Sequence, residues 1–145
     1  MSTRDNNLID LFRSLEGSPH IERPATEEIT PGQLLEDVAA GVKRHTKTSG
    51  PFEPIFALAN WQYYGKDIDD VYASGDVVMI RSFRAGDLVY AWYKGGASIA
   101  YGDYMVSAGD GTLEEYTNAY DPVVGVCLET HASDPGLIRL KIRIT

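Results

Sequence analysis

Hydrophobic and polar residues alternate regularly near the end of the chain. In Ile138–Ile144, four aliphatic residues alternate with two arginines and one lysine. Because successive side chains of a β-strand point to opposite faces, this segment predicts a strand with one face in a core. The basic face meets water or an acidic neighbour, since no aromatic residues interleave with it as they do in strands that bind RNA.

Short segments rich in β-forming residues follow one another from Pro51 onward. Gly-Asp or Asp-Pro interrupts them at intervals of about ten residues, which is typical of an all-β sandwich or barrel. We therefore expect a mainly β fold, with a small β-barrel or β-sandwich domain over residues 51–145. The predicted strands are Ile55–Trp61, Val77–Phe83, Asp87–Tyr93, Ser98–Tyr101, Tyr104–Ser107, Thr112–Tyr116, Pro122–Glu129 and Leu137–Ile144.

Apolar residues recur at helical spacing before this region. Within Asp5–Gly17, the positions of Leu8, Leu11, Phe12 and Leu15 predict a short amphipathic helix, and an extended linker with two prolines follows it.

A second helix is predicted to begin after Thr30. Thr30 and Gln33 have the spacing of a capping box, and Pro31 occupies the first helical position. A flexible break at Thr48–Pro51 then separates residues 1–50, an N-terminal arm with two short helices, from the β domain. Both helices are also compatible with packing on their own domain. The apolar stripe of the second helix comprises Leu34, Leu35, Val38 and Val42.

Turn signals punctuate the β-rich region. Gly-Asp occurs four times, and a β-like segment follows each of the first three immediately. Glycine adopts positive φ without steric cost, and aspartate accepts a hydrogen bond from a nearby backbone N–H. The last occurrence continues as Asp110-Gly111, a preferred pair for a tight hairpin. A phosphate-binding loop is excluded here because no helix follows, and calcium would find only Asp110 as a ligand.

The composition limits the classes of function that we expect for this protein. The chain has 145 residues, one cysteine, a formal net charge of −8 and a pI near 4.7. Nucleic-acid binding needs a basic face, so we expect no nucleic-acid partner. The first residues lack the layout of a signal peptide, and no apolar run is long enough to span a membrane. We therefore expect a protein made in the cytoplasm, without a disulfide, a membrane partner or a cofactor.

Residues whose side chains could bind a metal or act in catalysis are scattered along the sequence. Asp67, Asp69 and Asp70 could offer oxygen ligands to a metal, but they lack the glycine and distal glutamate of an EF-hand loop. Cys127 lies in an apolar run and is interpreted as a core residue. No catalytic motif is present. The histidines are interpreted as surface residues without metal-ligand spacing: His20, His45 and His131.

Aromatic residues are dense in two segments. Trp61–Tyr64 and Tyr90–Tyr93 place rings on both faces of their predicted strands, so some rings face outward or lie beneath another element. Outward tyrosine and tryptophan side chains anchor protein interfaces or stack on sugars.

The order of motifs from Ile68 to Thr145 resembles the small capsid decoration, or cement, proteins of tailed bacteriophages. The resemblance rests on Arg84–Ala91, Gly102-Asp103, Ser107–Leu113, Val123–Glu129 and the basic-apolar last strand. It implies a non-enzymatic protein on the outer capsid surface of the virion that stabilises contacts between capsomers. The implied partners are the major capsid protein and further copies of this chain, with a trimer favoured over a dimer. The matched turn-forming positions are Gly86, Asp87, Gly102, Asp103, Gly109, Asp110 and Gly111.

The N-terminal segment is longer than we expect for that family. We interpret it as an arm that reaches over the capsid lattice or a neighbouring subunit, and expect residues of the arm and of the aromatic segments to contact the capsid or another subunit. These candidates are Leu8, Leu11, Phe12, Leu15, Trp61, Tyr64 and Trp92.

Two other functions remain open. One is a carbohydrate-binding β module of a virion fibre or surface protein, with a stacking platform drawn from Trp61, Tyr64, Trp92 and Tyr93. The other is a small β-fold hydrolase with a metal at the Asp67–Asp70 cluster.

Overall fold

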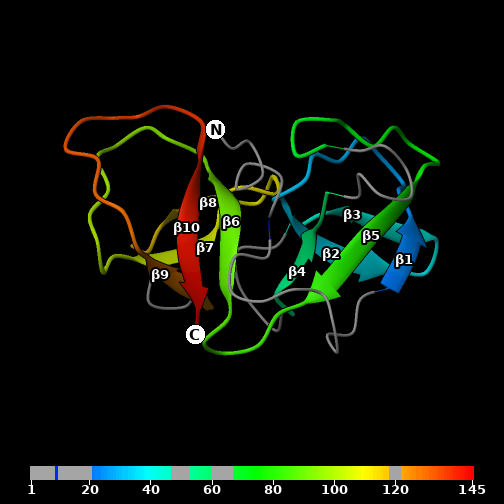
Figure 1. Ribbon diagram of the computed structural model, residues 1–145, viewed down its shortest axis with the longest axis horizontal. Helices are drawn as coiled ribbons and strands as arrows, with labels where there is room; N and C mark the ends of the chain where they lie inside the picture. The colour runs from blue at the N-terminus through cyan, green and yellow to red at the C-terminus, as the bar shows by residue number, and fades with distance from the viewer. Residues whose placement is uncertain (1–8, 10–20, 47–52, 60–66, 118–121) are drawn as a thin grey trace.

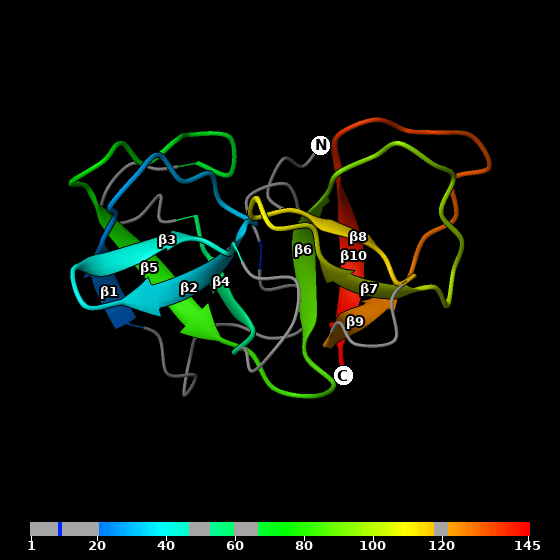
Figure 2. The same cartoon turned by 180° about the vertical axis from the view of Figure 1, so that it is seen from behind.

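The protein consists of β-structure in the part of the chain that the structure describes. The computed structural model describes residue 9 and residues 21–46, 53–59, 67–117 and 122–145. Ten strands form two five-stranded sheets that lie side by side (Figures 1 and 2), which confirms the mainly β prediction. The strands are β1 (Ile21–Pro24), β2 (Leu34–Val38), β3 (Gly41–Arg44), β4 (Ile55–Ala57), β5 (Val77–Ser82), β6 (Leu88–Tyr93), β7 (Tyr104–Ser107), β8 (Leu113–Glu115), β9 (Val123–Cys127) and β10 (Ile138–Ile144).

The first sheet has the strand order β1-β5-β4-β2-β3, and all its paired strands are antiparallel. Its two outer strands also approach each other, because Ala25 forms a parallel bridge with Val42 and the backbone N–H of Thr26 donates to the Val42 carbonyl at 2.9 Å. The predicted break at Thr48–Pro51 lies outside the described residues. Strands β2 and β3, which precede it, lie in the same sheet as β4 and β5, which follow it.

The second predicted helix is wrong, because Leu34–Val38 and Gly41–Arg44 form the β2-β3 hairpin. The capping-box hydrogen bond does form: the backbone N–H of Thr30 donates to Gln33 Oε1 at 2.9 Å. It closes a β-turn instead of a helix, since the Gln33 N–H donates to the Thr30 carbonyl and Gly32 has a φ of 95°. Pro31-Gly32 suits the two central positions of a type II turn.

The other N-terminal prediction lies almost wholly outside the described residues. Ile9 alone is described within the predicted helix at Asp5–Gly17. It is 2% exposed, and its carbonyl accepts a hydrogen bond of 2.8 Å from the Tyr90 N–H. At this residue the N-terminal segment therefore contributes to the core of its own chain.

The second sheet closes on itself as a small barrel with the strand order β10-β6-β8-β7-β9. The predicted last strand is confirmed as β10, which pairs with β6 from Ile138 to Arg143 and with β9 from Ile142 to Ile144. Closure between β6 and β8 depends on the single parallel pair Tyr93↔Leu113. The predicted strand at Ser98–Tyr101 is reduced to one isolated bridge, Ile99↔His131.

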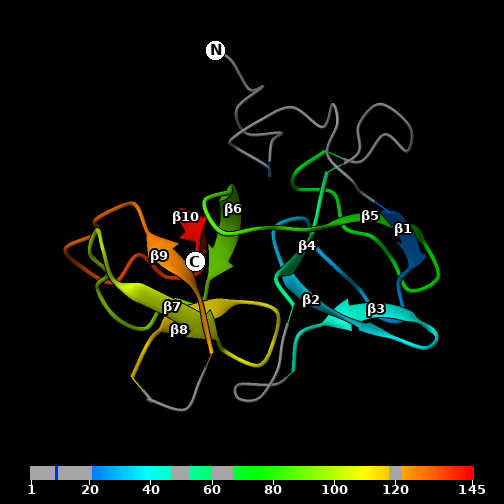
Figure 3. The same ribbon diagram turned by 90° about the horizontal axis from the view of Figure 1, so that it is seen from below.

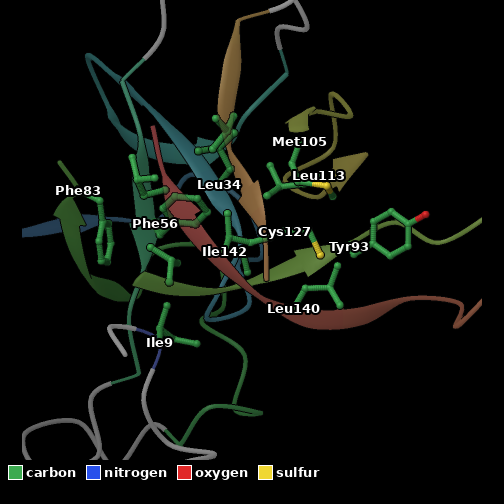
Figure 4. Packing of buried hydrophobic residues seen from close by; sticks show 14 of the residues in the cluster. Ile9, Leu34, Phe56, Phe83, Tyr93, Met105, Leu113, Cys127, Leu140 and Ile142 are labelled. Atoms are coloured by element: carbon green, nitrogen blue, oxygen red, sulfur yellow. The ribbon is translucent and has the colours of Figure 1, made fainter. Parts of the chain in front are cut away.

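The first sheet buries both of its faces. Successive residues of β4 and β5 alternate between two hydrophobic clusters, so that Ile55 and Ile80 lie in one cluster while Phe56 and Met79 lie in the other. The cluster that contains Phe56 and Met79 also contains the residues of the barrel interior. Figure 4 shows Leu34 and Phe56 of the first sheet packed together with residues from the barrel strands, and Figure 3 shows the two sheets adjacent from below. The two sheets therefore share one core.

Candidate interaction surface

Trp92 lies at the joint between the two sheets, by which we mean the place where the turn around Pro31 meets strands β6 and β10 of the barrel. The Arg139 guanidinium carbon lies 4.2 Å from the centre of the Trp92 ring, and Trp92 Nε1 donates to the Pro31 carbonyl at 3.0 Å. Arg139 also donates to the carbonyls of Pro31 and Ile68 and to Asp69 Oδ1. The predicted contact residue Trp92 is thus half-buried and engaged within its own chain through Arg139 and Pro31.

The repeated Gly-Asp dipeptides close turns of one kind. In Ala73–Asp76, Arg84–Asp87 and Ala100–Asp103, the aspartate carboxylate accepts from the first residue's N–H at 2.8–2.9 Å, and the aspartate N–H donates to that residue's carbonyl. The glycines Gly75, Gly86 and Gly102 have φ angles of 94–96°.

The fourth dipeptide lies in the β7-β8 hairpin. There Gly109 and Gly111 have positive φ, and Asp110 Oδ1 accepts from the Thr112 N–H at 3.0 Å. The hairpin touches the first sheet, because the Gly111 carbonyl accepts from the Leu34 N–H at 2.8 Å. All seven predicted turn-forming positions therefore lie in turns.

Two loops project from the barrel at the end away from the first sheet, residues 94–103 and 128–137, which we call the outer loops (Figures 1 and 2). Ile99 and His131 exchange two backbone hydrogen bonds of 3.1 and 2.7 Å. Asp134 Oδ1 accepts from the N–H groups of Gly96 and Gly136, and the Tyr101 N–H donates to Thr130 Oγ1 at 3.0 Å. These bonds fix the outer loops against each other.

Three tyrosines lie in the outer loops or directly next to them in the fold, and we call them together the tyrosine surface: Tyr101, Tyr104 and Tyr116. Tyr101 is 66% exposed and Tyr104 is 53% exposed. The Tyr104 and Tyr116 rings meet edge to face with their centres 6.4 Å apart, and the Tyr116 N–H donates to the Tyr104 carbonyl. Sequence reasoning missed this surface. The available signal was the pair of tyrosines flanking Gly102-Asp103, because side chains next to a tight turn tend to face solvent.

Two carboxyl groups adjoin these tyrosines in the sequence but not on the same face: Glu115 pairs with the buried Met105 and so points to the opposite side of its strand from Tyr116. Glu115 is hydrogen-bonded to Asp103, and both the partial burial of Glu115 and the nearby Asp103 charge raise the pKa of Glu115. Asp103 Oδ2 in turn accepts from the Ala100 N–H at 2.9 Å. Like charges held this close are unfavourable unless a proton or a cation joins them.

His45 corrects another prediction, because it is 4% exposed and not a surface residue. Its Nδ1 lies 2.8 Å from Ser107 Oγ, which links the first sheet to the end of β7. Ser107 Oγ also accepts from the Gly109 N–H at 3.1 Å. This buried pair supports the contact between the two sheets. His131 is partly exposed and lies 3.1 Å from Glu129, and His20 lies outside the described residues.

Cys127 is a buried core residue, as expected, and its Sγ donates to the Glu129 carbonyl at 3.2 Å. Burial raises the pKa of its thiol. In the Asp67–Asp70 segment, Asp70 accepts from the Asp67 N–H and Asp69 pairs with Arg139, so these carboxylates serve a turn and an ion pair. The described residues contain no group of three metal-ligating side chains. They also include no helix with the length and apolarity that a bilayer requires.

Several predicted contact residues cannot be placed, because Leu8, Leu11, Phe12, Leu15, Trp61 and Tyr64 lie outside the described residues. Tyr93, a candidate for the stacking platform, is 2% exposed, and its hydroxyl donates to the Ala97 carbonyl at 2.9 Å. Burial raises the pKa of that hydroxyl. Of the two described aromatic residues proposed for sugar stacking, Tyr93 is buried and Trp92 has Arg139 over its ring.

Comparison with known proteins gives a structural relative but no relative by sequence. No protein-family model and no curated protein sequence matches the chain. Among solved structures, the fold is similar to the head fiber gp8.5 N base of bacteriophage phi29, with a TM-score of 0.57 and 13% sequence identity. The match covers 88% of this chain and 93% of the other, so the shared fold includes both sheets.

Proposed function

We propose that this chain is a non-enzymatic structural protein of a bacteriophage virion. It binds the outer surface of the head, where it stabilises contacts between capsomers. The observation that carries the proposal is the similarity to a phage head fiber base over nearly the whole chain. The sequence resemblance to capsid decoration proteins, which covers Ile68 to Thr145, supports the same kind of assembly from independent features.

The physical properties of the chain are consistent with this role. Both sheets share one core, and the outer loops are cross-linked by hydrogen bonds, so the protein offers a preformed surface. A net charge of −8 limits self-association away from the head. The proposed partners are the major capsid protein and further copies of this chain, as a trimer, after synthesis in the host cytoplasm.

Co-sedimentation tests the proposal directly. Purified protein is mixed with expanded heads that lack it, the heads are pelleted, and the bound copies are counted. Saturation at a number fixed by the symmetry of the shell supports the head-binding role. If folded protein stays in the supernatant at all concentrations, the role is wrong.

A second function is favoured by one observation, the exposed rings of Tyr101 and Tyr104. Exposed aromatic rings with neighbouring carboxylates also suit sugar recognition, as in a carbohydrate-binding module of a virion fibre. Binding to a glycan array that disappears in Tyr101→Ala would support this alternative.

A further inference from the structure

We propose that the tyrosine surface, together with the acidic end of the barrel on which it lies, is the site at which this protein docks on a positively charged protein surface of the phage head. This inference rests on the proposed head-binding function and names the part of the molecule that carries it.

The tyrosine surface exposes large rings at an end of the barrel where Leu137 is the other exposed large hydrophobic residue among the described ones. Tyr101 and Tyr104 are two of only six large hydrophobic side chains exposed among the described residues. Tyr116 extends the surface through its edge-to-face contact with Tyr104. Tyrosine is enriched where proteins bind one another, because it supplies a large contact area and a hydroxyl while losing little rotamer entropy.

The surface is held in place before any partner arrives. The Gly102 N–H donates to the Cys127 carbonyl at 2.8 Å, and the Cys127 N–H donates to the Asp103 carbonyl at 2.8 Å. With the bond between Tyr101 and Thr130, these contacts fix the backbone on both sides of the turn. Binding to a preorganised surface avoids the entropy cost of ordering a loop.

The charge around the tyrosine surface selects a basic partner. Residues 94–104, 113–117 and 128–137 contain five carboxylates and one lysine. Glu114 pairs with that lysine at 3.9 Å and Glu129 lies next to His131, so two of the carboxylates have a basic neighbour. Among the described residues, Asp103, Glu115 and Asp134 form no ion pair with a basic side chain, so this end of the barrel carries an excess of negative charge that a basic partner would neutralise. A second acidic copy of this chain does not supply that charge as readily.

The test uses the full chain and expanded heads that lack it. In the variant Tyr101→Ser/Tyr104→Ser, we expect the affinity for heads to fall at least tenfold. The matched control is Ile21→Ser, which removes a side chain of similar exposure, 56%, from the edge of the first sheet and should leave the affinity unchanged. Thermal unfolding of each variant establishes that it is folded.

Charge is tested with Glu115→Lys and with salt. The wild-type affinity should fall as sodium chloride is raised, and Glu115→Lys should bind more weakly with a shallower salt dependence. A basic partner surface is contradicted if the wild-type affinity for heads does not change with the sodium chloride concentration, or if Glu115→Lys binds heads more tightly than the wild type.

The outcomes separate this inference from the proposed function. If the wild type does not bind heads, both are wrong. If the wild type binds and the double tyrosine variant binds equally well, the docking site is wrong and the head-binding function stands. If the double variant retains head binding but loses self-association or glycan binding, the surface serves copies of the chain or sugars, and the inference is overturned.

Discussion

The guanidinium group of Arg139 lies over the ring of Trp92, with its central carbon 4.2 Å from the ring centre. The two residues face each other across neighbouring strands of the barrel, in the register Arg139↔Trp92. Both side chains also bind the Pro31 carbonyl, which belongs to a turn of the first sheet. One stacked pair on the barrel therefore holds the turn that begins the β2 strand.

Replacing Arg139 by lysine should destabilise this joint. Lysine cannot place several N–H donors on two carbonyls while stacking on an indole ring, so we expect the free energy of unfolding to fall by about 1.5–3 kcal/mol. Chemical denaturation measures the loss. Arg143→Lys, at an exposed position of the same strand, is the control and should stay within about 0.5 kcal/mol of wild type. Equal effects of the two substitutions would contradict the role of the joint.

Gly32→Ala tests how closely the turn approaches the barrel. A Cβ atom on Gly32 would lie 2.9 Å from the Tyr90 carbonyl oxygen, and the φ of 95° already disfavours a side chain. Gly75 has nearly the same φ, 94°, with no atom within 4 Å of its Cβ position. Gly75→Ala should cost about 1–2 kcal/mol from backbone conformation alone. Gly32→Ala should cost more, and thermal or denaturant unfolding of both variants gives the comparison.

Most strands from Ile55 onward, though not the one at Ser98–Tyr101, could be predicted because their signals are local. The alternation in Ile138–Ile144 and the Gly-Asp turns depend on side-chain direction and on φ, and neither requires knowledge of distant residues. The second predicted helix failed because its signals were also compatible with a turn and a strand. Pro31-Gly32 is as typical of a type II turn as Pro31 is of a helix start. Leu34 and Leu35 are neighbours in the sequence and both are buried, because each faces a different hydrophobic cluster. This arrangement depends on the packing of both sheets.

The candidate surface was harder to predict than the fold. Tryptophan is a residue type that is enriched in interfaces. In this fold, however, Arg139, which lies 47 positions after Trp92 in the chain, stacks over the Trp92 ring. The exposure of Tyr101 and Tyr104 depends on how the outer loops pack, which no local pattern reveals. His45 is buried for the same kind of reason, since its partner Ser107 lies in the other sheet.

Asp87 does more than close a turn, because its carboxylate also lies 3.4 Å from the buried guanidinium of Arg81. Asp87→Asn keeps an acceptor for the turn but removes the charge that faces Arg81. Breaking one side of a buried ion pair costs about 3–5 kcal/mol, so we expect a loss of this order. Asp76→Asn changes the same kind of turn at a less buried position and should cost about 1 kcal/mol. A similar loss in both variants, measured by denaturation, would show that the ion pair contributes little.

The hydrogen-bonded carboxyl pair Glu115 and Asp103 should give a distinctive dependence of stability on pH. Because the pKa of Glu115 is raised in the folded protein, its contribution to stability is complete below the ordinary value of 4.5 and is lost as the pH rises through the folded pKa. Glu115→Gln cannot lose a proton, so it should match the wild type below that pH and be more stable than the wild type at pH 7.

Glu27→Gln provides a control of opposite sign. The Arg44 side chain lowers the pKa of Glu27, so the stability from Glu27 is present above the ordinary value of 4.5 and is lost as the pH falls through the folded pKa. This variant should be less stable than the wild type at pH 7, with the difference shrinking in acid. Unfolding curves from pH 3 to pH 7 for the three proteins measure both trends. If Glu115→Gln is less stable than the wild type at pH 7, the carboxyl pair is not a repulsive contact.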